Sequence, residues 1–164
     1  MVTSGRMAGP RYPLEALRKL RDERAEAQAQ ALAAQIARSE AAETKLRERE
    51  VARREHALRT AETERSEAGR LAEGVSGADL QRWADFAAAA RFQAEALERL
   101  ESEARRNLVE ERARERQLRE ELSSREAEAE LVRRHEHGFH HHHAERQEKA
   151  DEEAALEQWS ARRH

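Results

Sequence analysis

The chain has no cysteine, which excludes disulfides and cysteine-ligated zinc sites. Proline occurs only at Pro10 and Pro13, so no proline interrupts a helix in the rest of the chain. Aromatic residues make up 4% of the sequence, too few for an ordinary compact core. No apolar run approaches the roughly 20 residues that cross a bilayer, and residues 1–11 lack the hydrophobic core of a signal peptide. We therefore expect a cytoplasmic protein with no direct membrane insertion.

Charge and helix-forming residues are what the chain has in abundance. Charged residues make up 40% of it and its mean hydropathy is −1.08, and such low hydrophobicity is typical of intrinsically disordered chains. However, the net charge is only −3, and alanine, glutamate, arginine and leucine dominate, all strong helix formers. This composition is typical of a coiled coil or a long helix. Because the balance is not basic, we expect no nucleic-acid partner.

The stretch from residue 74 to residue 80 carries the signals of one helix end and one helix start. Gly74 is suited to the left-handed position that follows a helix C-terminus. Ser76 and Asp79 have the spacing of a capping box, in which each side chain bonds the other's backbone N–H. Val75 and Leu80 fall where a hydrophobic staple packs. The stretch therefore predicts a chain reversal.

We predict an all-α fold, a long two-helix antiparallel coiled-coil hairpin. A flexible tail over 1–12 precedes a single hairpin over 13–162, with helices over about 13–72 and 79–160 and a turn over 73–78. A reversal between Val75 and Ser76 makes the numbers of facing residues sum to about 151. At 1.5 Å per residue, the hairpin is expected to be on the order of 90 Å long, with the C-terminal end projecting beyond it.

The second helix has the clearer heptad pattern. Every seventh residue from Leu80 and from Trp83 is usually apolar, which is strong evidence for a coiled coil. The apolar stripe of the first helix is thin and drifts, so no single heptad frame fits it. Its members are Leu14, Leu17, Ala25, Ala29, Leu32, Ile36, Leu46, Val51, Leu58, Ala61, Ala68 and Leu71.

No catalytic motif is present: there is no glycine-rich phosphate loop, no His-Glu-x-x-His motif and no cysteine nucleophile. We expect no enzyme activity and no cofactor. Histidines cluster at His135, His137 and 140–143 with one-turn spacings that can hold zinc or nickel. The simpler interpretation is an exposed histidine-rich helix that binds metal only incidentally, so we assign no metal site. A pH-sensitive repulsion is a further alternative, since histidines titrate near neutrality.

Three aromatic residues lie close together after the turn. The heptad positions that face the other helix form the seam of the coiled coil. Trp83 is at a seam position, Phe86 flanks the seam, and Phe92 lies on the opposite side of its helix. Packing accounts for Trp83, and a lone exposed phenylalanine is ordinary. Three aromatics within ten residues nevertheless favour a partner surface beside the turn. Trp159 is a weaker candidate for a second contact.

Three segments resemble the FliJ/YscO family of type III secretion stalk proteins. Residues 78–86 read ADLQRWADF, like the start of that family's second helix. Residues 145–154 read ERQEKADEEA, like its closing signature, and residues 12–21 read YPLEALRKLR, like its start. The resemblance covers about 12–162. The histidine run and Gly138 depart from the family pattern.

The resemblance implies a central stalk of a hexameric secretion ATPase, flagellar or injectisome, at the inner-membrane secretion apparatus. It implies contacts with the cytoplasmic domain of the export gate and with secretion chaperones. The gate contact would lie at Trp83, Phe86 and Phe92 and the ATPase contact at the open end; the reverse assignment is the alternative. The open-end candidates are Arg18, Arg21, Arg146, Gln147, Lys149 and Asp151. The alternative is a generic coiled-coil scaffold or a homodimeric adaptor.

Overall fold

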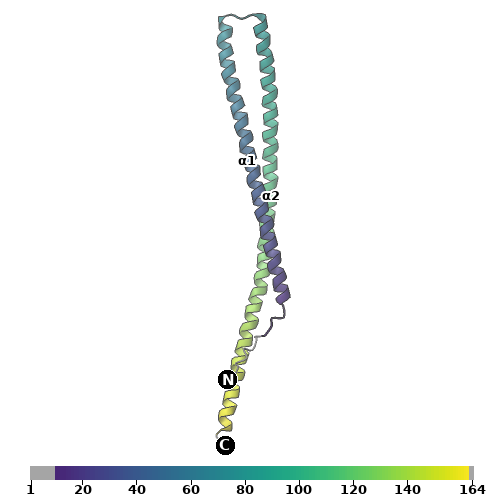
Figure 1. Cartoon of the computed structure of the whole chain (residues 1–164), viewed down its shortest axis with the longest axis vertical. Coiled ribbons are helices and arrows are strands. Elements are labelled where there is room, and N and C mark those ends of the chain that lie inside the picture. Colours follow the sequence, from purple (N-terminus) through teal and green to yellow (C-terminus); the bar gives the residue numbers. More distant parts are fainter. Residues whose placement is uncertain (1–9, 163–164) are drawn as a thin grey trace, which may run out of the picture. The chain divides into compact units, whose positions relative to one another are not determined.

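The computed structural model describes residues 10–162, which form two long helices. Helix α1 spans Glu15–Glu73 and helix α2 spans Gly77–Ala161, with a short turn between them (Figure 1). The two helices pack against each other and run antiparallel, and the described residues contain no strand. The predicted all-α helical hairpin is confirmed.

The turn is built as the sequence predicts. Gly74 has a φ of 100°, and its N–H donates to the Leu71 carbonyl at 3.3 Å, which ends α1. The Ser76 N–H donates to the Asp79 carboxylate at 3.0 Å, and the Asp79 N–H donates to the Ser76 hydroxyl at 3.3 Å. This reciprocal pair is a capping box that starts α2. The staple contributes less than expected, because Leu80 is 49% exposed.

The packing of the chain falls into two units. The turn unit comprises Leu32–Gln117, that is, the turn and the parts of both helices next to it. The terminal unit joins the described residues up to Ala31 with those from Leu118 onward. Each unit contains one segment of α1 packed on one segment of α2, so each has its own seam.

The seam of the turn unit is made of alanines and polar side chains. On α2 the buried residues are Ala90, Glu101, Ala104 and Leu108, all of which lie at the predicted heptad positions. On α1 the buried residues are Gln35, Ser39, Ala42 and His56. Alanines let two helix backbones approach closely, but they bury little apolar area. The unit therefore relies on polar contacts as well.

The terminal unit packs the beginning of α1 against α2. Ala129 is buried at its seam, and every residue from 144 to 162 is exposed, so this end of α2 extends beyond α1 (Figure 1). Of the tail expected over 1–12, residues 1–9 lie outside the described residues. Tyr12 is only 4% exposed and packs against α2 just before α1 begins. Its expected place in a flexible tail is therefore wrong.

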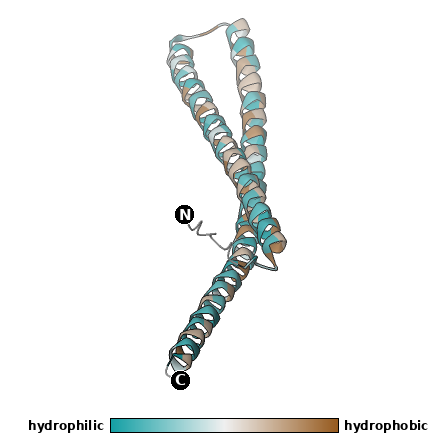
Figure 2. Cartoon of the chain, turned by 60° about the horizontal axis from the view of Figure 1, so that its bottom comes forward, coloured by the Kyte–Doolittle hydropathy of each residue, from teal (hydrophilic) through white to brown (hydrophobic). Residues whose placement is uncertain are grey.

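Half of the predicted apolar stripe of α1 is wrong, because six of its twelve members are exposed: Leu14, Leu17, Ala29, Val51, Leu58 and Ala68. One heptad frame fits the burial of α1 from Arg18 to Thr63, except at the exposed Arg53, and polar residues occupy much of this frame. Figure 2 shows hydrophilic residues along both helices. In residues 10–162, neither helix has a stretch both long and apolar enough to cross a membrane. The buried and half-buried seam positions of α1 are Arg18, Ala25, Leu32, Ser39, Leu46 and Thr60, with Arg21, Gln28, Gln35, Ala42, Arg49, His56 and Thr63.

Candidate functional site

Charged side chains bridge α1 and α2 in the terminal unit. The Arg18 Nε lies 3.1 Å from the Glu136 carboxylate, and the Arg133 guanidinium lies 2.8 Å from Asp22. Arg21 pairs with Glu128 on the opposite helix. Arg18 and Arg21 are half-buried in these pairs. Both arginines, predicted as ATPase contacts, thus hold the two helices together.

The other predicted open-end residues lie elsewhere. Arg146, Gln147, Lys149 and Asp151 are all exposed on the part of α2 that extends beyond α1. The Arg146 Nε donates to the His142 carbonyl of its own helix at 3.2 Å. Ten residues separate Glu136, the partner of Arg18, from Arg146 along α2, which is about 15 Å of helix. The six candidates therefore do not form one patch.

The turn unit has its own bridging contacts. The carboxylate of Glu101 is buried and lies 2.6 Å from the Arg53 Nε and 2.8 Å from the Arg105 guanidinium. The Gln35 amide donates to the Glu111 carbonyl at 3.1 Å. Arg53 faces Glu101 and Gln35 faces Glu111, so the numbers of facing residues sum to 154 and 146. Both sums are close to the expected 151, and the predicted pairing of the helices is confirmed.

The structure brings Trp83 and Phe86 together beside the turn. The two rings line a hollow of about 270 Å³ between the helices, together with Thr63, Glu67 and Arg70 of α1. Phe86 is 36% exposed, and the Trp83 Nε1 is buried without a hydrogen-bond partner in the described residues. Trp83 is half-buried, so a packing role and a role at a partner surface are compatible for it.

Trp83 also lines a larger hollow, of about 390 Å³, between the helices. Ala87, Ala90 and Ala94 of α2 line it, with His56 and Ala61 of α1 among the residues opposite. Residues 87–90 are four consecutive alanines, whose small side chains leave space between helices that larger residues would fill. The hollow can accept an apolar side chain from a partner.

Phe92 does not line these hollows. It is 69% exposed, as expected for a position opposite the seam. The three aromatic candidates therefore form a pair, Trp83 with Phe86, and one separate exposed ring. A partner would need to contact two faces of the hairpin to use all three.

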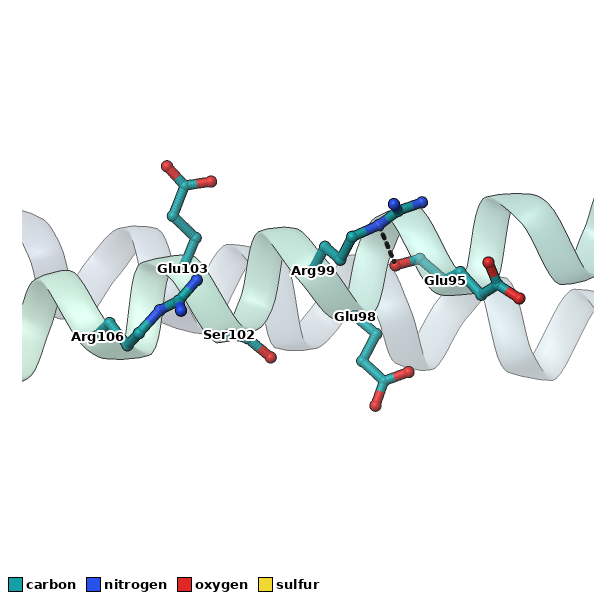
Figure 3. Close-up of a pocket in the computed structure, with 6 residues that line it drawn as sticks. All are labelled: Glu95, Glu98, Arg99, Ser102, Glu103 and Arg106. Atoms are coloured by element: carbon teal, nitrogen blue, oxygen red, sulfur yellow. Dashed lines mark hydrogen bonds between the residues drawn. The ribbon is translucent and has the colours of Figure 1, made fainter.

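A hollow of about 610 Å³ is lined by residues of α2 alone. Figure 3 shows its lining side chains, among which Glu98 and Glu103 point to opposite sides. Arg99 donates to the carbonyl of Glu95 at 3.3 Å, a contact within one helix. These side chains do not converge on a common point, so this hollow has no arrangement suited to acid–base chemistry.

Tyr12 is the seam contact that the sequence prediction missed. Its hydroxyl lies 2.8 Å from the His135 Nδ1 and 3.5 Å from the Val132 carbonyl oxygen. Its ring lies 5.6 Å from the ring of Phe139, measured between centroids. Burial raises the pKa of the Tyr12 hydroxyl, and the nearby Glu136 carboxylate raises it further. The signal was the only tyrosine of the chain, placed directly before Pro13 and close to the start of α1 at Glu15.

The histidine run divides between two environments. The ring of His140 lies beside those of Tyr12 and Phe139, at 6.4 and 5.4 Å. His141 and His142 are exposed and face Glu145, one turn further along α2. His143 is half-buried. The run is therefore not a uniform exposed patch.

Two surfaces are left for a partner: the aromatic pair beside the turn and the exposed end of α2. The first places the rings of Trp83 and Phe86 in one hollow with charged residues such as Arg82 and Glu67. The second is charged and carries the candidates Arg146, Gln147, Lys149 and Asp151. No protein-family model, curated protein or solved structure matches the chain.

Proposed function

We propose that this chain is a non-enzymatic central-stalk subunit of a type III secretion or flagellar export ATPase. The observation that supports this most is the antiparallel hairpin, in which a single chain supplies both helices of the coiled coil. A central stalk needs paired helices that stay together, and the ion pairs between α1 and α2 in each unit serve that need. The resemblance of residues 12–21, 78–86 and 145–154 to the FliJ/YscO family supports the same assignment.

The two exposed surfaces suggest how the partners divide. The aromatic pair Trp83 and Phe86, with Phe92, is the proposed contact for the cytoplasmic domain of the export gate. The exposed end of α2 is the proposed contact for the ATPase hexamer, through Arg146 and Lys149. Arg18 and Arg21 support this contact only indirectly, by holding α1 to α2. Secretion chaperones are the remaining proposed partners, at the cytoplasmic face of the inner-membrane apparatus.

Hydrolysis of ATP by the purified hexameric export ATPase of the same genome tests the proposal. We expect the chain to bind the hexamer and to raise its rate of hydrolysis. The double variant Arg146→Ala/Lys149→Ala is expected to lose most of this stimulation. The matched control Arg91→Ala/Arg106→Ala removes two exposed arginines of α2 in the turn unit and is expected to keep it.

Two results would change the assignment. If the hexamer neither binds the chain nor responds to it, the stalk proposal is wrong. If Trp83→Ala removes stimulation while Arg146→Ala/Lys149→Ala does not, the two ends are exchanged and the ATPase contacts the turn.

A coiled-coil scaffold or homodimeric adaptor is the second candidate. It is favoured by Leu156, a large apolar side chain that is exposed on the end of α2. Burial of such residues between two copies would stabilise a dimer. Light scattering over a range of concentrations decides this point, because a stable mass of two chains supports the adaptor and a mass of one chain supports the stalk.

A further inference from the structure

His141, His142 and Glu145 form a compact group on the exposed end of α2. One potential ligand atom from each residue lies within 4.8 Å of the others. The His141 Nδ1 is 3.5 Å from one oxygen of the Glu145 carboxylate, and the His142 Nδ1 is 3.2 Å from the other. The two rings meet edge to face, with their centroids 6.0 Å apart.

Helix geometry explains why these three residues converge while their neighbours do not. Successive residues are rotated by about 100°, so Glu145 lies about 40° from His141 and about 60° from His142 around the axis. His140 and His143 lie about 140° and 160° from Glu145, on the far side of the helix. Of the four consecutive histidines, only His141 and His142 can therefore bind the same metal ion as Glu145.

We propose that His141, His142 and Glu145 form a zinc site. Two imidazoles and one carboxylate are a donor set that zinc takes in proteins, with water in the fourth position. Ligand atoms at about 2.0 Å from a tetrahedral zinc ion lie about 3.3 Å apart, so the three groups need only small side-chain movements to bind. All three are exposed, and no packed residue has to be displaced. The spacing of the histidines alone did not indicate this site, because Glu145 supplies the third ligand.

The site lies where α2 has no α1 segment beside it. Zinc bound there links residues one turn apart and stabilises the helix directly before Arg146 and Gln147. The inference stands on the placement of three side chains and is independent of the proposed stalk function.

Isothermal titration of the full chain with zinc chloride tests the site. We expect one zinc ion per chain, and weaker binding by at least about tenfold in His141→Ala/His142→Ala, because even the loss of a group that orients a ligand typically weakens metal binding 10–100-fold. Glu145→Gln is expected to weaken binding as well. The matched control His140→Ala/His143→Ala removes the same number of histidines and is expected to bind zinc as tightly as the unaltered chain.

The two double variants give a clear decision. Equal weakening in both means that zinc binds the histidine run without a defined site, and the proposal is then wrong. It is also wrong if Glu145→Gln binds zinc as tightly as the unaltered chain. Circular dichroism of each variant without zinc ensures that a change in binding is not a loss of helix.

Discussion

At the scale of single residues, the carboxylate of Asp79 is stabilised in its ionised form by several hydrogen bonds at the turn. Hydrogen bonds from the Ser76 hydroxyl and backbone N–H, with a further one from Arg82, lower the pKa of Asp79 to about 2. Its negative charge also lies in the first turn of α2, where the helix dipole favours an anion. The cap therefore works best when Asp79 is ionised.

A pH titration of the Asp79 carboxyl by NMR checks this cap. We expect a midpoint near 2, and in Ser76→Ala a midpoint shifted upward toward the ordinary value of 3.8. Because the pKa is lower in the folded chain, the stabilisation by Asp79 is complete above pH 3.8 and disappears as the pH falls through about 2. An unshifted midpoint in the unaltered chain would show that the capping box does not form.

Tyr12 anchors the start of the hairpin through its hydroxyl and its ring. Tyr12→Phe removes the hydrogen bond to His135 and keeps the contact with Phe139. We expect it to lower the free energy of unfolding by about 0.5–1.5 kcal/mol, measured by urea denaturation followed by circular dichroism. A variant as stable as the unaltered chain would mean that the hydroxyl adds nothing to the packing of this residue.

At the scale of the helices, the seam of α2 was predictable, and that of α1 was predictable only at apolar positions such as Ala25, Leu32 and Leu46. The α2 seam repeats apolar residues such as Leu108 and Ala129, and heptad spacing alone identifies them. The α1 seam contains Gln35 and Ser39, which are also ordinary surface residues. Polar residues in a seam become recognisable only once their partners are known, and the partner of Gln35 is Glu111 on the other helix.

Ser39 is a weak point of this polar seam. It is 5% exposed, and its hydroxyl has no hydrogen-bond partner in the described residues. An unsatisfied buried polar group costs about 1–3 kcal/mol. Ser39→Ala is therefore expected to raise the free energy of unfolding in urea by about 1 kcal/mol or more.

A control on the exposed surface separates this effect from helix propensity. Ser66→Ala makes the same chemical change at an exposed position of α1. Alanine favours a helix over serine by a few tenths of a kcal/mol, and this is all that we expect there. Equal stabilisation by both substitutions would show that burial of the Ser39 hydroxyl does not destabilise the folded chain.

At the scale of the whole molecule, the sequence predicted the antiparallel arrangement of the helices. It predicted the placement of the candidate site residues only in part. Caps and heptads define the turn and the pairing of the helices, because they depend on local spacing. Spacing also placed Trp83 beside Phe86, three residues apart on one helix. It did not separate arginines such as Arg18, which hold the helices together, from the exposed Arg146, because that distinction depends on the opposite helix.

The central claim is that one chain supplies both helices of each seam. The natural chain has no cysteine, so paired cysteines react specifically with a short dimaleimide linker. Gln28 and Glu121 are hydrogen-bonded across the terminal unit at 2.8 Å, and Glu43 and Arg112 are paired across the turn unit at 3.3 Å. Each pair is therefore a suitable site for two cysteines.

Cross-linking of Gln28→Cys/Glu121→Cys, and separately of Glu43→Cys/Arg112→Cys, tests the central claim most directly. We predict that both variants form a link within one chain, seen as a product with the mass of one chain, 18.9 kDa, plus one linker, in a yield that is independent of concentration. Mixing chains that carry only one cysteine each is predicted to give no linked product. Linked dimers from those mixtures, in place of the intramolecular product, would contradict the hairpin.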